Sequence, residues 1–554
     1  MQRWPAIGVR EGPLADMAPH GLAGAGAGSG GGQSAEQTEN LEVELKLTGD
    51  PERLEAAWKG RVLAKGGGRE VVRRLETTYY DTSDQRLRRR GLALRVRCEG
   101  ERYTQTVKTE GDGLSGLQRR GEFSSAIASK TPDLRQITDA EIKRRMGLIL
   151  PGELEPVFTT RIERRIRKLR PKGAGHNGAL IEVALDRGEV TSARGAEPIA
   201  ELELELLEGP ALSIYDLAAR VNGETPLALE TVTKSERGYA LALGEEPSWV
   251  RADDPAFARE TTLNTAIDAI LRSCIRHWLA NQAAVLQGSD PEGVHQLRVA
   301  LRRLRSALSV FRHVLPPDDL AWINREARWL IQSLGPARDW DVFLTELLPP
   351  LSEARQDNAD VALLSEAAED ARRLGYERAR AALRSSRYTA FALDLGRWTE
   401  EAGWRGEADG ARFEEPLADY ACRLLRKRHK RVLKQGRDFE RLSDEERHRL
   451  RITLKKLRYA SEFFTGLYPK ARTRPYLKAL KGLQDELGHL NDVVVAESLL
   501  KGLFGDGGSS NSAALRAAAG LVVGWYSHAV AAGRPEIERR WRDFAASEPF
   551  WGKA

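Results

Sequence analysis

The spacing of apolar residues changes once along this chain of 554 residues and divides it into a strand-rich part and a helix-rich part. In the first part apolar and polar residues alternate within short segments, which is typical of β-strands. In the second part apolar residues recur every three or four positions, which predicts helices. We therefore expect an α+β multidomain protein. The clearest alternating segments are 92–96, 103–107, 180–185 and 200–207, and helices are expected near 51–59, 133–147 and 211–222.

Composition sets the expected domain boundaries. Residues 1–38 are rich in Gly and Ala and predict a disordered tail, within which Met17 is an alternative start to Met1. Residues 246–258 follow neither spacing and predict a linker. Because a chain of this length exceeds a single core, we expect one domain at 39–245 and another at 259–545.

Cysteine usage and apolar runs indicate the compartment. Cys98, Cys274 and Cys422 lie far apart and form no CxxC motif, which predicts a reducing cytoplasm and disfavours a cysteine-ligated metal. No segment approaches the roughly 18 apolar residues of a membrane span. The first residues contain no apolar signal-peptide region. We expect a cytoplasmic protein without a membrane partner.

Charged residues of one sign share a face on several predicted strands. Same-face neighbours on a strand lie about 6.5–7 Å apart, so like charges there repel unless opposite charges lie nearby. The strand 41–47 (LEVELKL) carries Glu42, Glu44 and Lys46. A later strand carries Glu201, Glu203 and Glu205, and the basic strands carry Arg95, Arg97 and Lys108.

Two arrangements explain these one-sided charges. A closed or nearly closed antiparallel barrel would turn them inward, where carboxylates suit hard divalent cations and basic groups suit phosphate oxygens. An antiparallel sheet with one solvated face would produce the same alternation. The pattern by itself leaves both arrangements open.

A series of motifs between residues 41 and 243 resembles the CYTH superfamily, the triphosphate tunnel metalloenzymes. The series begins with Glu42-x-Glu44-x-Lys46. It continues in order with YYDT at 79–82, LRVR at 94–97, TVK at 106–108, RGE at 120–122, IEVALDRG at 181–188, ELELE at 201–205 and KSERGY at 234–239.

This resemblance implies an eight-stranded antiparallel β-tunnel with flanking helices, which binds a triphosphate with Mg²⁺ or Mn²⁺. The implied metal ligands are Glu42, Glu44, Glu201 and Glu203, assisted by Asp186 and by Glu205 or Glu182. The implied phosphate-binding residues are Lys46, Arg95, Arg97, Lys108, Arg120, Lys234 and one arginine of the strand 158–164, where we prefer Arg164 to Arg161. These cations, with Glu42 and Glu44, are the implied catalytic residues.

The helical part contains an internal repeat. Residues 295–311 match residues 448–464 without a gap, and Leu334-Gly335 corresponds to Leu487-Gly488 at the same offset. A register that persists in this way predicts two copies of one unit, packed as a pseudo-two-fold helical bundle. Asp339, four residues after Gly335, is expected to cap the next helix.

Basic residues form a stripe on each copy. No acidic residue interrupts 293–317, whereas a solvated helix face would interleave acids, so the stripe predicts an anion-binding surface. The first stripe contains His295, Arg298, Arg302 and Arg305, with Arg303 beside it. The second contains His448, Arg451, Lys455 and Arg458, with Lys456 beside it. A further basic segment at 423–437 presents Arg426, Lys430 and Lys434 on one face.

Residues 259–545 resemble the CHAD domain, an α-helical histidine-bearing module associated with polyphosphate binding. The resemblance rests on 294–305, 334–341, 448–459 and 487–492. It implies long-chain polyphosphate as a ligand and an association with polyphosphate granules. Nucleic acid is disfavoured as a partner because, apart from Tyr459, no aromatic residue interrupts the stripes.

Taken together, the two resemblances imply an inorganic triphosphatase that hydrolyses tripolyphosphate to pyrophosphate and phosphate and also binds polyphosphate. The alternatives are a non-catalytic polyphosphate-binding scaffold, and adenylate cyclase or thiamine triphosphatase activity in the same tunnel. The residues themselves do not distinguish between these triphosphates.

Overall fold

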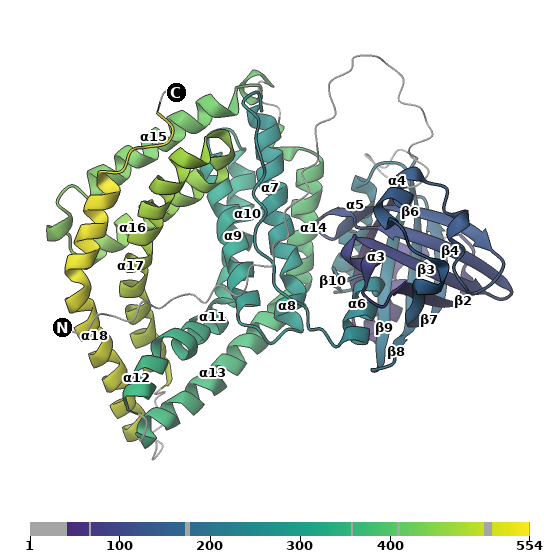
Figure 1. The fold of residues 1–554 in the computed structure, drawn as a ribbon, viewed down its shortest axis with the longest axis horizontal. Coiled ribbons are helices and arrows are strands. Elements are labelled where there is room, and N and C mark those ends of the chain that lie inside the picture. The colour runs from purple at the N-terminus through teal and green to yellow at the C-terminus, as the bar shows by residue number, and fades with distance from the viewer. Residues whose placement is uncertain are drawn as a thin grey trace. The chain divides into compact units, whose positions relative to one another are not determined.

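A strand-rich N-terminal part is followed by a helical C-terminal part, as the ribbon in Figure 1 shows. The computed structural model describes residues 41–552 except 66–67, 172–177, 356–357, 407–409 and 504–511. The predicted disordered tail, 1–38, therefore lies outside the described residues.

Eight antiparallel strands close into a barrel in the N-terminal part. The strand order is β1-β9-β8-β7-β2-β3-β4-β6, and β6 pairs back onto β1, from Leu41↔Gly121 to Leu45↔Leu117. This closure confirms the tunnel and rules out the open sheet with one solvated face. The barrel strands are β1 (Leu41–Thr48), β2 (Val71–Thr82), β3 (Leu92–Glu99), β4 (Arg102–Thr109), β6 (Leu117–Ile127), β7 (Leu154–Leu169), β8 (Leu180–Ser192) and β9 (Gly195–Glu208).

Two short strands extend the barrel. β5 (Asp112–Leu114) pairs with β6, and β10 (Ala228–Glu230) pairs with β1 beyond the point where β6 ends. The register of β10 places Glu230 opposite Lys46.

The alternation on the strands is explained by burial of both barrel faces. Leu45, Leu47, Leu202 and Leu204 point outward and are fully buried. They belong to a core cluster that includes residues of α1 (Pro51–Lys59) and α5 (Leu212–Glu224). The charged residues between these leucines consequently point into the barrel.

Further short helices belong to the N-terminal part. The helix expected at 133–147 is shorter than predicted, because Asp139 caps α4 (Ala140–Met146) and Gly147, with φ of +61°, ends it. The other helices are α2 (Arg61–Ala64), α3 (Arg86–Arg89) and α6 (Lys234–Leu243).

Helices make up the C-terminal part. They are α7 (Leu263–Ala280), α8 (Gln282–Leu286), α9 (Glu292–Val310), α10 (Pro317–Ser333), α11 (Gly335–Val342), α12 (Pro349–Ala354), α13 (Ala359–Leu383), α14 (Ser386–Glu400), α15 (Leu417–Gln435), α16 (Asp444–Phe463), α17 (Lys470–Leu503) and α18 (Ser512–Ala545). Among the described residues, none of the helices combines the length and the apolar character needed to cross a bilayer.

The two copies of the repeat differ locally. In the first copy one helix ends at Ser333 and another begins at Gly335, because Pro336 starts a new helix. In the second copy Leu487 and Gly488 lie within α17, where no proline follows. Asp339 lies inside α11, so the expectation that it caps a helix is wrong.

The segment between the two parts, residues 245–261, contains neither helix nor strand. Residues 41–554 nevertheless form one compact unit, and a single core cluster contains side chains from both parts. The predicted domain boundaries around residues 245 and 258 therefore stay a prediction.

We expect Gly238→Ala to destabilise the protein by about 1–3 kcal/mol, because the added Cβ would overlap the Phe158 ring where α6 packs on β7. Gly223→Ala is the matched control, since it also lies in a helix but has open space around it, and it should stabilise the protein by at most about 1 kcal/mol. Urea unfolding of both variants measures the difference. Equal effects would contradict this packing.

Candidate active site and anion-binding surface

The interior of the barrel is lined by charged side chains of both signs. Arg164 lies inside, with a side chain 13% exposed, whereas Arg161 lies on the outer surface, 57% exposed, and pairs with Glu76. Nearly every residue that the tunnel resemblance implied points into this interior. They are Glu42, Glu44, Lys46, Arg95, Arg97, Lys108, Arg120, Arg164, Asp186, Glu201, Glu203 and Lys234.

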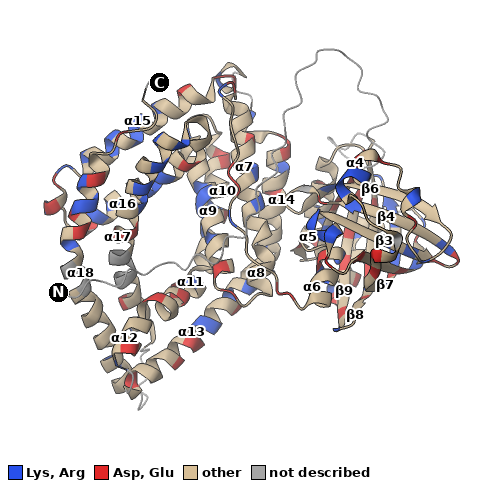
Figure 2. Cartoon of the chain, in the orientation of Figure 1, with Lys and Arg blue, Asp and Glu red and all other residues tan. Residues whose placement is uncertain are grey.

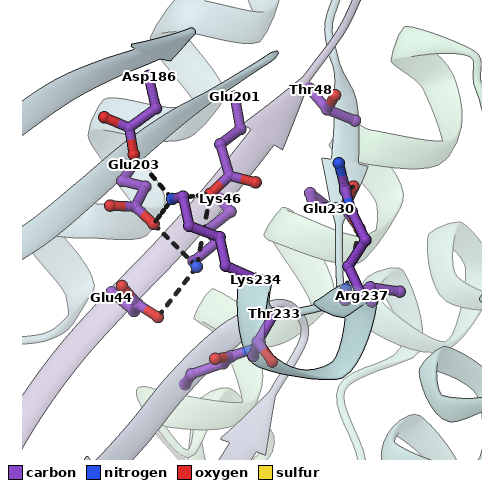
Figure 3. Close-up of polar contacts among 12 residues, drawn as sticks. Glu44, Lys46, Thr48, Asp186, Glu201, Glu203, Glu230, Thr233, Lys234 and Arg237 are labelled. Atoms are coloured by element: carbon purple, nitrogen blue, oxygen red, sulfur yellow. Dashed lines mark hydrogen bonds and ion pairs between the residues drawn. The ribbon is translucent and has the colours of Figure 1, made fainter. Parts of the chain in front are cut away.

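Three buried carboxylates converge at one side of the tunnel. Asp186 of β8 and Glu201 and Glu203 of β9 each offer an oxygen, and these oxygens lie within 4.8 Å of one another. Figure 3 shows Lys46 and Lys234 lying among them. The Nζ atom of Lys46 is 2.8 Å from Glu203, and that of Lys234 is 2.7 Å from Asp186.

The local sequence explains how Lys234 reaches this cluster. Thr233 accepts a hydrogen bond from the Glu236 amide (3.1 Å), and the Thr233 amide donates to the Glu236 side chain (2.7 Å). This capping box begins α6 at Lys234, so the lysine occupies the first turn of a helix whose start faces the tunnel.

The lysines compensate for the burial of the acids. Burial by itself raises the pKa of Glu203, but Lys234, Lys46 and Arg164 outweigh it and hold the pKa well below its usual value. The carboxylate is therefore ionised at neutral pH. One oxygen of Glu201 (Oε2) is buried and has no hydrogen-bond partner, which leaves a ligand position for a cation.

A second group of charges lies beside the first. Lys108 Nζ and Arg120 Nε are each 2.7 Å from Glu42, and Arg120 also pairs with Glu44. Burial raises the pKa of Glu42, but Lys108 and Arg120 outweigh it and lower the pKa strongly. Glu42 is thus ionised, and Arg120 joins both glutamates in the same network.

Cations exceed acids around β3. Arg97 forms no ion pair among the described residues, and Arg95 together with burial and Arg164 lowers its pKa to about 10, although Glu122 opposes this effect. The Nε atoms of Arg95 and Arg97 are buried without a hydrogen-bond partner. Such donors are free to bind an acceptor, and phosphate oxygens match them well.

Glu122 is a tunnel residue that we did not single out from the sequence. It lies 3.2 Å from Arg95 and 2.9 Å from Lys108 and so bridges two of the phosphate-binding candidates. Its place in the RGE motif was the available signal. Glu205 is separate from the three-carboxylate cluster, and burial, Glu42 and Glu182 raise its pKa to about 7.

The donor set fits a divalent cation held next to a polyanion. Clustered carboxylate oxygens are the ligands that Mg²⁺ and Mn²⁺ accept. The unpartnered Glu201 oxygen on one side and the unpartnered arginine nitrogens on the other provide complementary positions for a metal and for phosphate oxygens.

Basic residues in the helical part follow α9, α15 and α16, and Figure 2 shows Lys and Arg gathered along α15 and α16. His295 is half-buried, and burial together with Arg338, Arg302 and Arg298 lowers its pKa to about 3. Burial and Arg302 lower the pKa of Arg298 to about 10. The first stripe is thus a crowded set of cations around a neutral histidine.

The second stripe is more open than the first. His448 is exposed, while Arg451 and Lys455 are half-buried. Arg458 pairs with Glu462 at 3.3 Å, so one acid joins this stripe. Tyr459 is buried and offers no exposed ring between the cations.

Arg303 departs from its predicted role. It is 5% exposed, pairs with Asp254 and packs over the Phe463 ring, so it faces the core and not the basic surface. This placement argues against anion binding by Arg303. The helical period placed it beside the stripe but gave no indication of this partner.

Other predicted residues extend the basic surface. Lys456 is exposed, and burial with Arg431, Arg428, Arg312 and Arg305 lowers its pKa, which shows that cations from α9, α15 and α16 meet there. Arg305 contacts Asn324 at 3.3 Å. The remaining candidates, Arg426, Lys430 and Lys434, are exposed on α15.

Sequence comparisons identify two known domains. The CYTH domain model matches residues 40–239, and the CHAD domain model matches residues 269–501. An inorganic triphosphatase of Haemophilus influenzae is 32% identical over 173 residues, which is 30% of this chain and 46% of that protein. The chain thus spans about half the length of this relative.

Two uncharacterised proteins of Mycobacterium tuberculosis are 24% identical over 489 residues, or 83% of this chain and 88% of theirs. Among solved structures, the CHAD domain from the plant Ricinus communis is 35% identical, with a TM-score of 0.48, and covers 54% of this chain and 98% of that one. The chain therefore consists of a CYTH domain followed by a CHAD domain.

Proposed function

We propose that the tunnel is a metal-dependent inorganic triphosphatase, which hydrolyses tripolyphosphate to pyrophosphate and phosphate, and that the CHAD domain binds long-chain polyphosphate. The observation that carries the first part is the tunnel interior, where three carboxylates within 4.8 Å lie in one network with unpartnered arginine nitrogens. The inorganic triphosphatase of Haemophilus influenzae supports this assignment, over the part of that protein that matches.

The cations of the tunnel would bind the triphosphate. Arg95 and Arg97 donate through nitrogens that lack other partners, and Arg120, Lys108 and Arg164 exchange carboxylate oxygens for phosphate oxygens. A triphosphate carries several negative charges, and phosphoryl transfer depends mainly on positioning and on electrostatic stabilisation of these charges. The enclosed tunnel provides both.

Asp186, Glu201 and Glu203 would hold the divalent cation, with Glu42 and Glu44 on the neighbouring strand. When bound, Mg²⁺ or Mn²⁺ supplies charge neutralisation at the phosphate oxygens and lowers the pKa of a bound water. Lys46 and Lys234 neutralise these carboxylates in the structure and would then be released toward the phosphates.

Arg164 and Arg161 lie on the same strand, β7, but point to opposite faces of the barrel, so they provide a matched pair of variants. Arg164→Ala removes a tunnel cation, so kcat/KM for tripolyphosphate with Mg²⁺ or Mn²⁺ should fall about 100-fold. Arg161→Ala removes a neighbouring arginine from the outer surface and should change kcat/KM less than about twofold. Phosphate release from tripolyphosphate, ATP and thiamine triphosphate measures the activity and identifies the preferred substrate.

Three outcomes would contradict this proposal. Preference for thiamine triphosphate, or cyclic AMP formation from ATP, would assign one of the alternative activities. Absence of phosphate release with retained polyphosphate binding would favour the scaffold. Equal losses in the two arginine variants would contradict catalysis inside the tunnel.

The basic surface of the CHAD domain supports polyphosphate binding because cations from α9, α15 and α16 meet there. Arg302→Gln/Lys455→Gln should weaken binding of long-chain polyphosphate about tenfold. The slope of log Kd against log salt concentration should also fall by about one for each removed cation. Arg373→Gln/Arg378→Gln, on exposed positions of α13, is the control and should leave both quantities unchanged. Fluorescence-anisotropy titration at several salt concentrations measures them. Equal weakening in the two double variants would argue against this surface.

His295 should make stability depend on pH. Its pKa is about 3 in the folded protein and 6.5 ordinarily, so the unfolded chain binds the proton first and stability falls as pH decreases below 6.5. From pH 7 to pH 5 this contribution is about 2 kcal/mol. Urea unfolding at both pH values should show a smaller loss for His295→Gln than for the exposed control His313→Gln. An unchanged loss in His295→Gln would show that this histidine is charged in the folded state.

A further inference from the structure

One helix of the CHAD domain, α14, makes several contacts with the CYTH domain, and two of these contacts lead through short segments to tunnel cations. The first contact is made by Thr389, which is fully buried and whose hydroxyl donates to the backbone oxygen of Leu227 at 2.8 Å. The second is made by Glu400, which accepts two hydrogen bonds from Arg119, at 2.7 and 3.1 Å.

The first contact reaches Lys234 through β10. Gln282 of α8, itself fixed by the Tyr388 hydroxyl at 2.6 Å, donates to the Leu229 oxygen at 2.9 Å. CHAD side chains therefore satisfy backbone oxygens of β10 and of the residue before it. On its paired side, β10 places Glu230 opposite Lys46.

Only a short connection separates β10 from Lys234, and hydrogen bonds and an ion pair hold this connection in place. Glu230 accepts a hydrogen bond from the Val232 amide at 2.8 Å and pairs with Arg237 of α6 at 2.8 Å. A shift of β10 would consequently move the start of α6, where Lys234 contacts Asp186, Glu201 and Glu203.

The second contact reaches Arg120 through its neighbour. Arg119 and Arg120 are consecutive on β6, so Arg119 points outward to Glu400 while Arg120 points inward to Glu42 and Glu44. Arg272 of α7 also pairs with Glu400 at 2.9 Å, and the Glu400 carboxylate is 11% exposed. A bidentate pair with a largely buried carboxylate fixes the position of its strand.

We infer that Thr389 and Glu400 are positioning residues for the tunnel: α14 holds Lys234 through β10 and Arg120 through Arg119. The CHAD domain thereby takes part in triphosphate binding without touching the substrate. This inference rests on the proposed function. It predicts a defect in tripolyphosphate binding when either contact is removed within the intact chain.

The same helix supplies matched controls. Thr399 is also a buried threonine of α14, but its hydroxyl bonds only to Leu395 of its own helix. Thr389→Val should raise the KM for tripolyphosphate about tenfold with kcat changed less, because loss of positioned binding affects the bound state first. Thr399→Val should leave KM within about twofold of the value for the unmodified protein. Thr389→Ser keeps the hydroxyl and should therefore have a KM close to that of the unmodified protein.

Glu400→Gln should raise KM in the same way, with the exposed neighbour Glu401→Gln as its control. Titration calorimetry with tripolyphosphate should show the same ranking of affinities. Comparable effects of Thr389→Val and Thr399→Val on KM would overturn the inference, and so would a KM for Thr389→Ser that stays as high as that of Thr389→Val. Neither result would contradict the proposed triphosphatase function. If the unmodified protein neither binds nor hydrolyses tripolyphosphate, the proposed function fails and the inference falls with it.

Discussion

Mutual neutralisation of buried charges is the constraint on which the barrel depends. Each carboxylate or cation taken out of water loses several kcal/mol of solvation, which is recovered only when an opposite charge is held close. The tunnel satisfies this requirement with ion pairs between side chains of neighbouring strands, as in the contact of Lys46 with Glu203 and of Arg164 with Asp186. Among the described residues, the exceptions include Glu205, whose pKa is raised to about 7, the Glu201 oxygen and the Nε atoms of Arg95 and Arg97.

The orientation of the tunnel residues could be predicted from the sequence because strand parity is a local property. Alternation in β1 and β9 determined which glutamates share a face, and the choice of Arg164 over Arg161 needed only the correct parity. Closure of the barrel could not be predicted from the pattern alone, because it depends on the pairing of Leu41 with Gly121 across 80 positions. The bridging role of Glu122 likewise depends on contacts that no single strand reveals.

The orientation of residues in the helical part could be predicted less completely than that of the tunnel residues. The period identified the stripe of His295, Arg298 and Arg302, but a position beside a stripe can face either the core or the surface. Arg303 faces the core because Asp254, from the segment between the domains, pairs with it there. Similarly, the shared Leu-Gly of the two copies did not predict the break before α11, since Pro336 occurs in only one of them.

The two candidate sites differ in the balance of their acidic and basic residues. This difference is the reason why we propose different ligands for them. The tunnel holds acids and cations together, so under the proposed function it would bind a polyanion together with a divalent cation. The CHAD surface holds mainly cations, and burial together with neighbouring cations lowers the pKa of Arg298 and of Lys456, so under the proposed function a polyanion would bind there without a metal. Removal of divalent cations by chelation should therefore weaken tripolyphosphate binding in the tunnel more than polyphosphate binding by the CHAD surface, because the carboxylate cluster found among the described residues lies in the tunnel and would repel a bare triphosphate.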